Sequence, residues 1–108
     1  MKKIYLSIEE IDLGYLIETD LGFEFVANKD GVLKAEKENS IVMIMFKLNK
    51  TGTNTYSQIP EPFSKFLISN TRKDLIEKAN ISEQDSQFEK LYKLAGLDMM
   101  QINFKIHQ

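Results

Sequence analysis

The amino-acid sequence predicts an α+β domain: antiparallel N-terminal strands, then a small helical cluster, then a closing C-terminal strand. Two periodicities support this prediction. Apolar residues alternate through most of residues 4–27, whereas from residue 59 to 95 they recur every three or four positions. Strands that come first and helices that follow are typical of the α+β class. At 108 residues, the chain 1–108 is expected to form one domain with a single core.

Three short strands are expected at 4–8, 11–17 and 23–27, because apolar and polar residues alternate in each. Polar turns separate them, at 9–10 and at 19–22. Gly22 is free to take a positive φ in the second turn. The pattern predicts an antiparallel meander.

The next segments are less regular. Residues 28–40 are polar and predict a loop, with one helical turn near 32–37. Residues 41–48 carry the strongest strand signal, apolar on both faces at first, which is typical of a central strand covered on both sides. Residues 49–55 are rich in turn formers and predict an exposed, mobile loop.

Helical spacing begins after Pro60 and Pro62. Residues Phe63, Phe66 and Leu67 then form a stripe, and we favour burial against the sheet for at least two of them. A second helix is expected to start at Asn70 or Thr71. Its expected buried face consists of Leu75, Ile76 and Ala79.

A third helix is expected to open with Ser82-Glu83-Gln84-Asp85, a capping-box variant, and to end at Gly96. Its expected apolar face contains Phe88, Leu91, Tyr92 and Ala95. The segment 99–106 alternates and predicts one closing strand. Met99 and Met100 would then point to opposite faces. Core or edge packing is the favoured interpretation for them, and an exposed methionine in a contact patch is the alternative.

Composition argues against several functional classes. The chain contains no cysteine, so neither a disulfide framework nor a thiolate site is available. Fourteen basic residues against sixteen acidic ones give a net charge of −2, and the basic residues are scattered, so no direct binding of nucleic acid is expected. No apolar run is long enough to span a bilayer. Acidic residues follow Lys2 and Lys3 where a signal peptide would be apolar, so a cytoplasmic location is expected.

No catalytic or metal-binding pattern stands out, so the chain is predicted not to be an enzyme and to need no cofactor. The single histidine, His107, is next to the C-terminus, where solvation of a frayed end is the simpler interpretation. The carboxylates are most simply surface residues. The short polar junction between two predicted helices is a better candidate for function, because such junctions often bind partners. The predicted partner-binding residues are Ile68, Ser69, Asn70 and Thr71, with any exposed part of Phe63 and Phe66.

The sequence also resembles a known family. Residues 59–67 (Ile-Pro-Glu-Pro-Phe-Ser-Lys-Phe-Leu), the helix-and-cap segment 74–85 with Ile81-Ser82 and Asp85, and residues 88–98 resemble the N-terminal subdomain of HipA-family serine/threonine kinases. Residues 4–6, 14–16 and 23–25 resemble the opening strands of that subdomain. The kinase body has no counterpart in these 108 residues. In length and pattern the chain therefore resembles the small HipS-like antitoxins of HipBST toxin–antitoxin systems.

The resemblance implies a protein that docks on a HipT-type kinase and restrains it, with a HipB-like DNA-binding protein as a possible third member of the complex. The family junction commonly reads Leu-Pro-Glu-Gly before a bulky residue, whereas this chain has Leu67-Ile68-Ser69-Asn70-Thr71 and no tryptophan. We therefore expect docking, and not plugging of the kinase active site by a large side chain. Two alternatives stay open. One is a stand-alone regulatory or small-ligand-binding domain that homodimerises through an edge strand; the other is a domain detached from a larger kinase, retaining structure but little function.

Overall fold

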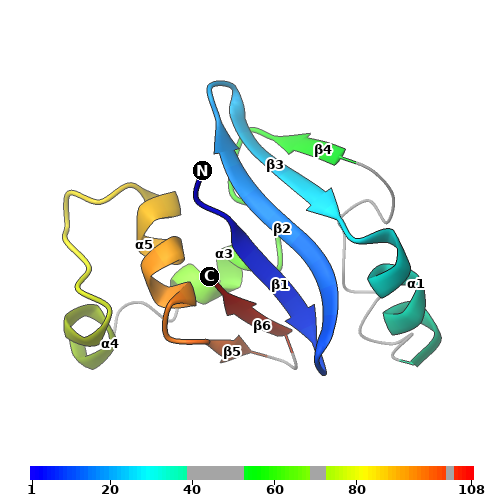
Figure 1. The fold of residues 1–108 in the computed structure, drawn as a ribbon. Coiled ribbons are helices and arrows are strands. Elements are labelled where there is room, and N and C mark those ends of the chain that lie inside the picture. Colours follow the sequence, from blue (N-terminus) through cyan, green and yellow to red (C-terminus); the bar gives the residue numbers. More distant parts are fainter. Residues whose placement is uncertain (39–52, 69–72, 102–103) are drawn as a thin grey trace.

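The computed structural model describes residues 1–38, 53–68, 73–101 and 104–108. The described strands form one antiparallel sheet, in the order β4-β3-β2-β1-β6-β5 (Figure 1). The strand bounds are β1 (Ile4–Ile8), β2 (Ile11–Thr19), β3 (Gly22–Ala27), β4 (Thr53–Tyr56), β5 (Met100–Gln101) and β6 (Phe104–His107). The helix α1 (Lys29–Glu38) packs beside β2, and α5 (Gln87–Ala95) packs against β1, β6 and the helix α3 (Phe63–Ile68). The helix α4 (Lys73–Lys78) lies beyond α5, farther from the strands (Figure 1). The predicted α+β class is confirmed.

The three N-terminal strands form the predicted meander. Tight turns join them: Glu9 and Glu10 have φ of 47° and 71°, and Gly22 has a φ of 140°. At Gly22 a Cβ would lie 2.3 Å from the Tyr56 carbonyl oxygen, so this position requires glycine for space as well as for conformation. The register of β1 and β2 shifts between Leu6 and Ser7, which marks a β-bulge.

The segment predicted as a loop with one helical turn is mostly a ten-residue helix, α1. Asn28 begins it, because its side-chain oxygen accepts a hydrogen bond from the Gly31 amide at 3.2 Å. Val32 and Ala35, three positions apart, are buried. The polar composition of the segment hid this short apolar stripe.

The expected mobile loop at 49–55 is wrong for its described part. Thr53 and Tyr56 bound the strand β4, which pairs with β3. Threonine and tyrosine favour strands, and pairing with β3 adds to that preference, so that together they outweigh the turn-forming residues. The predicted central strand at 41–48 lies outside the described residues.

The helical stripe of α3 and α5 covers one side of the sheet, and α5 contacts both β1 and β6. The predicted helix over Phe63 and Phe66 is confirmed. In α4, by contrast, no residue is buried, and Leu75 and Ile76 are only partly covered. Ala79, predicted on the same face, follows the helix and is also partly covered. The N-caps predicted for α4 lie outside the described residues. The main core comprises Ile4, Leu6, Ile8, Ile11, Leu13, Leu16, Phe25, Val32, Ala35, Ile59, Phe63, Phe66, Phe88, Leu91, Leu94, Ala95, Phe104 and Ile106.

Two predicted boundaries in the C-terminal part are wrong. The helix α5 begins after Ser86, not at Ser82, and its buried face includes Leu94 while Tyr92 is only partly covered. The closing strand is a hairpin, because β5 and β6 pair with each other, Met100 opposite Lys105. Met100 lies on the outer strand β5 and is 68% exposed, whereas Met99 is partly buried against the core.

Candidate functional site

The two phenylalanines of the predicted partner-binding set are core residues. Phe63 is 0% exposed and Phe66 is 1% exposed. Phe63 packs against Phe25 of β3, with ring centroids 5.8 Å apart. Burial of both rings is the interpretation that we favoured for the helix stripe. Neither ring has exposed surface, so we assign both to the core and neither to a partner-binding surface.

The rest of the predicted set lies at and beyond the end of α3. Ile68 is the last residue of that helix. Ser69, Asn70 and Thr71 lie outside the described residues. Leu67, the residue before Ile68, is partly buried and packs against the core. The next described helix, α4, begins at Lys73.

An open groove of about 520 Å³ lies beside Leu67. Four separate parts of the chain line it: β3, the segment after β4, α3 and the start of α5. The lining residues are Phe23, Ser57, Gln58, Ile59, Ser64, Leu67 and Gln87. None of these residues is charged, so the groove suits uncharged side chains of a partner better than charged ones.

A helix cap fixes the start of α5, which forms one side of this groove. Ser86 takes an extended conformation, and its hydroxyl oxygen accepts a hydrogen bond from the Glu89 amide at 3.1 Å. This cap places Gln87 at the first helical position, on the groove. The next residue, Phe88, is buried and stacks on Phe23 with centroids 6.1 Å apart. The groove therefore rests on an ordered helix start.

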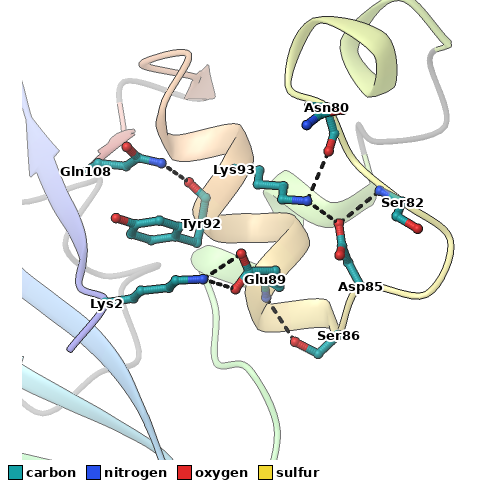
Figure 2. A network of polar contacts seen from close by, with 9 residues as sticks. All are labelled: Lys2, Asn80, Ser82, Asp85, Ser86, Glu89, Tyr92, Lys93 and Gln108. Carbon is teal, nitrogen blue, oxygen red and sulfur yellow. Dashed lines mark hydrogen bonds and ion pairs between the residues drawn. The ribbon is translucent and has the colours of Figure 1, made fainter.

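A polar network ties α5 to the turn that precedes it (Figure 2). Lys93 donates from Nζ to the Asp85 carboxylate at 2.7 Å and to the Asn80 carbonyl oxygen at 3.0 Å. Asp85 also accepts a hydrogen bond from the Ser82 amide at 2.9 Å. The hydrogen bond from Lys93, with that from the Ser82 amide, holds the pKa of Asp85 below its ordinary value.

The same helix binds both ends of the chain that the structure describes. Lys2 donates to both carboxylate oxygens of Glu89, at 2.6 and 2.7 Å (Figure 2). This hydrogen bond raises the pKa of Lys2. Near the other end, the Gln108 side-chain amide donates to the Tyr92 carbonyl oxygen at 2.9 Å. These contacts fix α5 against the sheet from the solvent side.

The single histidine lies in a strand, whereas the sequence predicted a frayed and solvated chain end. His107 lies in β6 and its ring stacks on Tyr5, with centroids 5.3 Å apart and planes 10° from parallel. Among the described residues, no group of three or more histidine, aspartate or glutamate side chains is placed to hold a metal ion. Within the same residues, no helix combines the length and the apolar character needed to cross a membrane.

Sequence reasoning missed most of the groove. Phe23, Gln58 and Gln87 come from distant elements, and no local pattern links them. One signal was present: Ser86 and Glu89 have the Ser-x-x-Glu spacing that marks a helix start. The Ser82 and Asp85 pair directly before it has the same spacing and forms only a turn.

Comparisons with protein-family models, with curated proteins and with solved structures find no match to this chain.

Proposed function

We propose that this chain is a non-enzymatic antitoxin subunit that binds a HipT-type serine/threonine kinase toxin and restrains it. The proposal rests on the resemblance to the N-terminal subdomain of HipA-family kinases. The structural observation that supports it is the uncharged groove beside Leu67, because the candidate junction 68–71 directly follows that residue in the sequence. The complex would form in the cytoplasm.

Docking at this groove accounts for restraint without a catalytic group. The kinase would insert uncharged side chains between Phe23 and Leu67. It would also contact the junction that follows Leu67 in the sequence. A stable interface of this kind buries roughly 1,200–2,000 Å² in total, so the groove would be its centre and not its whole extent. A HipB-like protein in a ternary complex would make the DNA contacts.

Co-purification tests the docking step. The chain and an adjacent kinase that lacks this subdomain are co-expressed, with a tag on the kinase alone. The proposal predicts a stable complex in which both proteins elute together. A kinase that elutes without the chain would remove the proposal.

One conservative substitution tests the groove itself. Gln87→Glu is almost isosteric and suits the first turn of α5, but it puts a charge on an uncharged surface that a partner would cover. We expect the affinity for the kinase to fall roughly tenfold. Gln84→Glu is the matched control, because Gln84 is exposed in the preceding turn and does not line the groove. Equal loss in both variants would locate the interface elsewhere.

The alternative is a regulatory or small-ligand-binding domain that homodimerises through an edge strand. Within the described sheet, β4 and β5 are the outer strands. This alternative predicts a dimer of the isolated chain in analytical ultracentrifugation. The antitoxin proposal predicts that the kinase complex forms whether or not such a dimer exists.

A further inference from the structure

The outward face of the sheet carries a row of three rings on neighbouring strands. Tyr15 lies on β2, Tyr5 on β1 and His107 on β6. Tyr5 is at the middle, 5.7 Å from the ring of Tyr15 and 5.3 Å from that of His107. Successive strand residues point to opposite faces. Since Leu6 and Ile106 point into the core on which α5 packs, the rings face away from it.

A depression of about 580 Å³ lies over the part of this row formed by Tyr5 and His107. Tyr5 and His107 contribute to its lining, and the exposed Met100 stands at one side. Methionine is a flexible side chain that adapts to different partners. The depression therefore combines ring faces with an adaptable apolar wall.

The charged residues of this lining are mostly acidic. Four carboxylates line it against one lysine, Lys105. The acidic residues are Glu9, Glu10, Asp12 and Asp98. They converge from three places: the turn between β1 and β2, the start of β2, and the segment before β5. Asp12 is already occupied, because it accepts a hydrogen bond from the Asn28 side chain at 2.9 Å.

The protein itself places one cation on this row. The Lys3 ammonium lies 4.5 Å from the centroid of the Tyr15 ring, a cation–π distance. The neighbouring Tyr5 and His107 rings have no such contact among those the structure describes. Ring faces beside carboxylates favour a cation, and a planar guanidinium most of all, since it stacks on rings and pairs with carboxylates.

We propose that this face binds an arginine-bearing basic segment of a protein partner. A guanidinium would stack on the row of Tyr5 and His107 while the acidic residues Glu10 and Asp98 attract the segment. The acidic lining would repel the phosphates of a nucleic acid. This site is distinct from the groove beside Leu67, and its existence does not depend on the antitoxin proposal.

The test uses two acidic residues that can be replaced by asparagine without adding backbone strain. Glu10 and Asp98 have φ of 71° and 52°, and asparagine tolerates this left-handed region well. The variant Glu10→Asn, Asp98→Asn thus removes two charges and keeps the backbone. The matched control, Asp20→Asn with Glu83→Gln, removes the same charge at exposed positions that do not line the depression.

The probe is a short peptide of alternating arginine and glycine, and a second peptide has citrulline in place of arginine. Changes in the NMR chemical shifts of the backbone amides locate the binding site, and fluorescence anisotropy measures the affinity for each peptide. We expect arginine-dependent shifts at Tyr5, Ser7, Lys105 and His107. The Glu10→Asn, Asp98→Asn variant should bind about three- to tenfold more weakly than the charge-matched control.

Several results would overturn the proposal. It would be contradicted by chemical-shift changes confined to other faces, by equal binding of the citrulline peptide, or by equal affinity of the two variants for the arginine peptide. Tighter binding of a single-stranded oligonucleotide to the same face would assign it to nucleic acid instead. Concentration-dependent shifts on this face without any peptide would show that a second copy of the chain covers it.

Discussion

Lys93 and Asp85 form an ion pair, 2.7 Å from Nζ to Oδ2, that joins α5 to the turn before it. The same ammonium reaches the carbonyl oxygen of Asn80, which follows α4 with a φ of 57°. One side chain thus fixes the end of α4 and the approach to α5. The groove beside Leu67 depends on that approach, because Gln87 begins α5.

Lys93→Met should lower the melting temperature at neutral pH and raise the pKa of Asp85 toward its ordinary value. In the native protein this pKa is lowered, so the pair stabilises the fold above the unfolded-state pKa of about 3.9. That contribution disappears as the pH falls through the folded-state pKa. The difference in melting temperature between native protein and variant should therefore shrink below about pH 4.

Lys90→Met is the control for the Lys93 prediction. Lys90 also lies on α5, but it lowers the pKa of Asp85 less, and only by charge. We expect a smaller change in both quantities, measured by NMR titration of the carboxylate and by thermal melts. A gap between native protein and Lys93→Met that stays constant down to pH 2 would contradict the assignment.

Gly31→Ala tests the contact between α1 and β2. A Cβ at Gly31 would lie 1.7 Å from the Asp12 carbonyl oxygen, so the helix must move away from the strand. We expect a loss of about 2–3 kcal/mol in the free energy of unfolding. At Gly96 a Cβ would meet mainly the flexible side chain of Gln108, so Gly96→Ala should change stability little or raise it slightly. Urea denaturation of the pair checks both, and similar losses at the two positions would argue against the close α1–β2 packing.

Glu10→Gly should stabilise the first hairpin. Glu10 has a φ of 71°, a conformation costing a residue with a side chain roughly 1–2 kcal/mol, of which glycine's greater flexibility offsets part. The expected net gain is about 0.5–1 kcal/mol. Glu24→Gly, in the extended strand β3, should instead lose a similar amount. Chemical denaturation distinguishes them, and a loss in both would show that the turn is not strained.

Phe66→Ala tests the assignment of the α3 stripe to the core. The ring is almost fully buried, so its removal should cost about 3–5 kcal/mol. Leu21→Ala is the control, because Leu21 is 88% exposed in a turn, and we expect a change within about 0.5 kcal/mol. A Phe66→Ala protein that keeps its stability and loses only its kinase would return this residue to the interface.

The parts of the fold that the sequence predicted are those with an unbroken local pattern. The alternation from Ile4 to Ile17 defined both strands of the first hairpin, and the stripe of Phe63 and Phe66 defined α3. The full length of α1, predicted only as one helical turn, and the strand β4 were not predicted, because the residues of both segments favour loops and turns. The helix α1 hides two apolar residues among charged ones, and β4 owes its strand to pairing with β3.

The candidate surfaces were harder to predict, since both are assembled from distant segments. The groove joins Phe23 to Gln87, and the ring row joins Tyr5 to His107. No spacing along the chain reports either pairing. The predicted partner-binding residues beyond Ile68 lie outside the described structure, so they remain a prediction from the sequence.

Growth rescue tests the central claim most directly. Cells express a HipT-type kinase that lacks this subdomain, and their growth or arrest is scored. The chain is supplied as the native protein, as Gln87→Glu or as Gln84→Glu. The antitoxin proposal predicts restored growth with the native protein and with Gln84→Glu, and weaker rescue with Gln87→Glu at equal protein level. Continued arrest with all three, although the chain is folded and abundant, would contradict it.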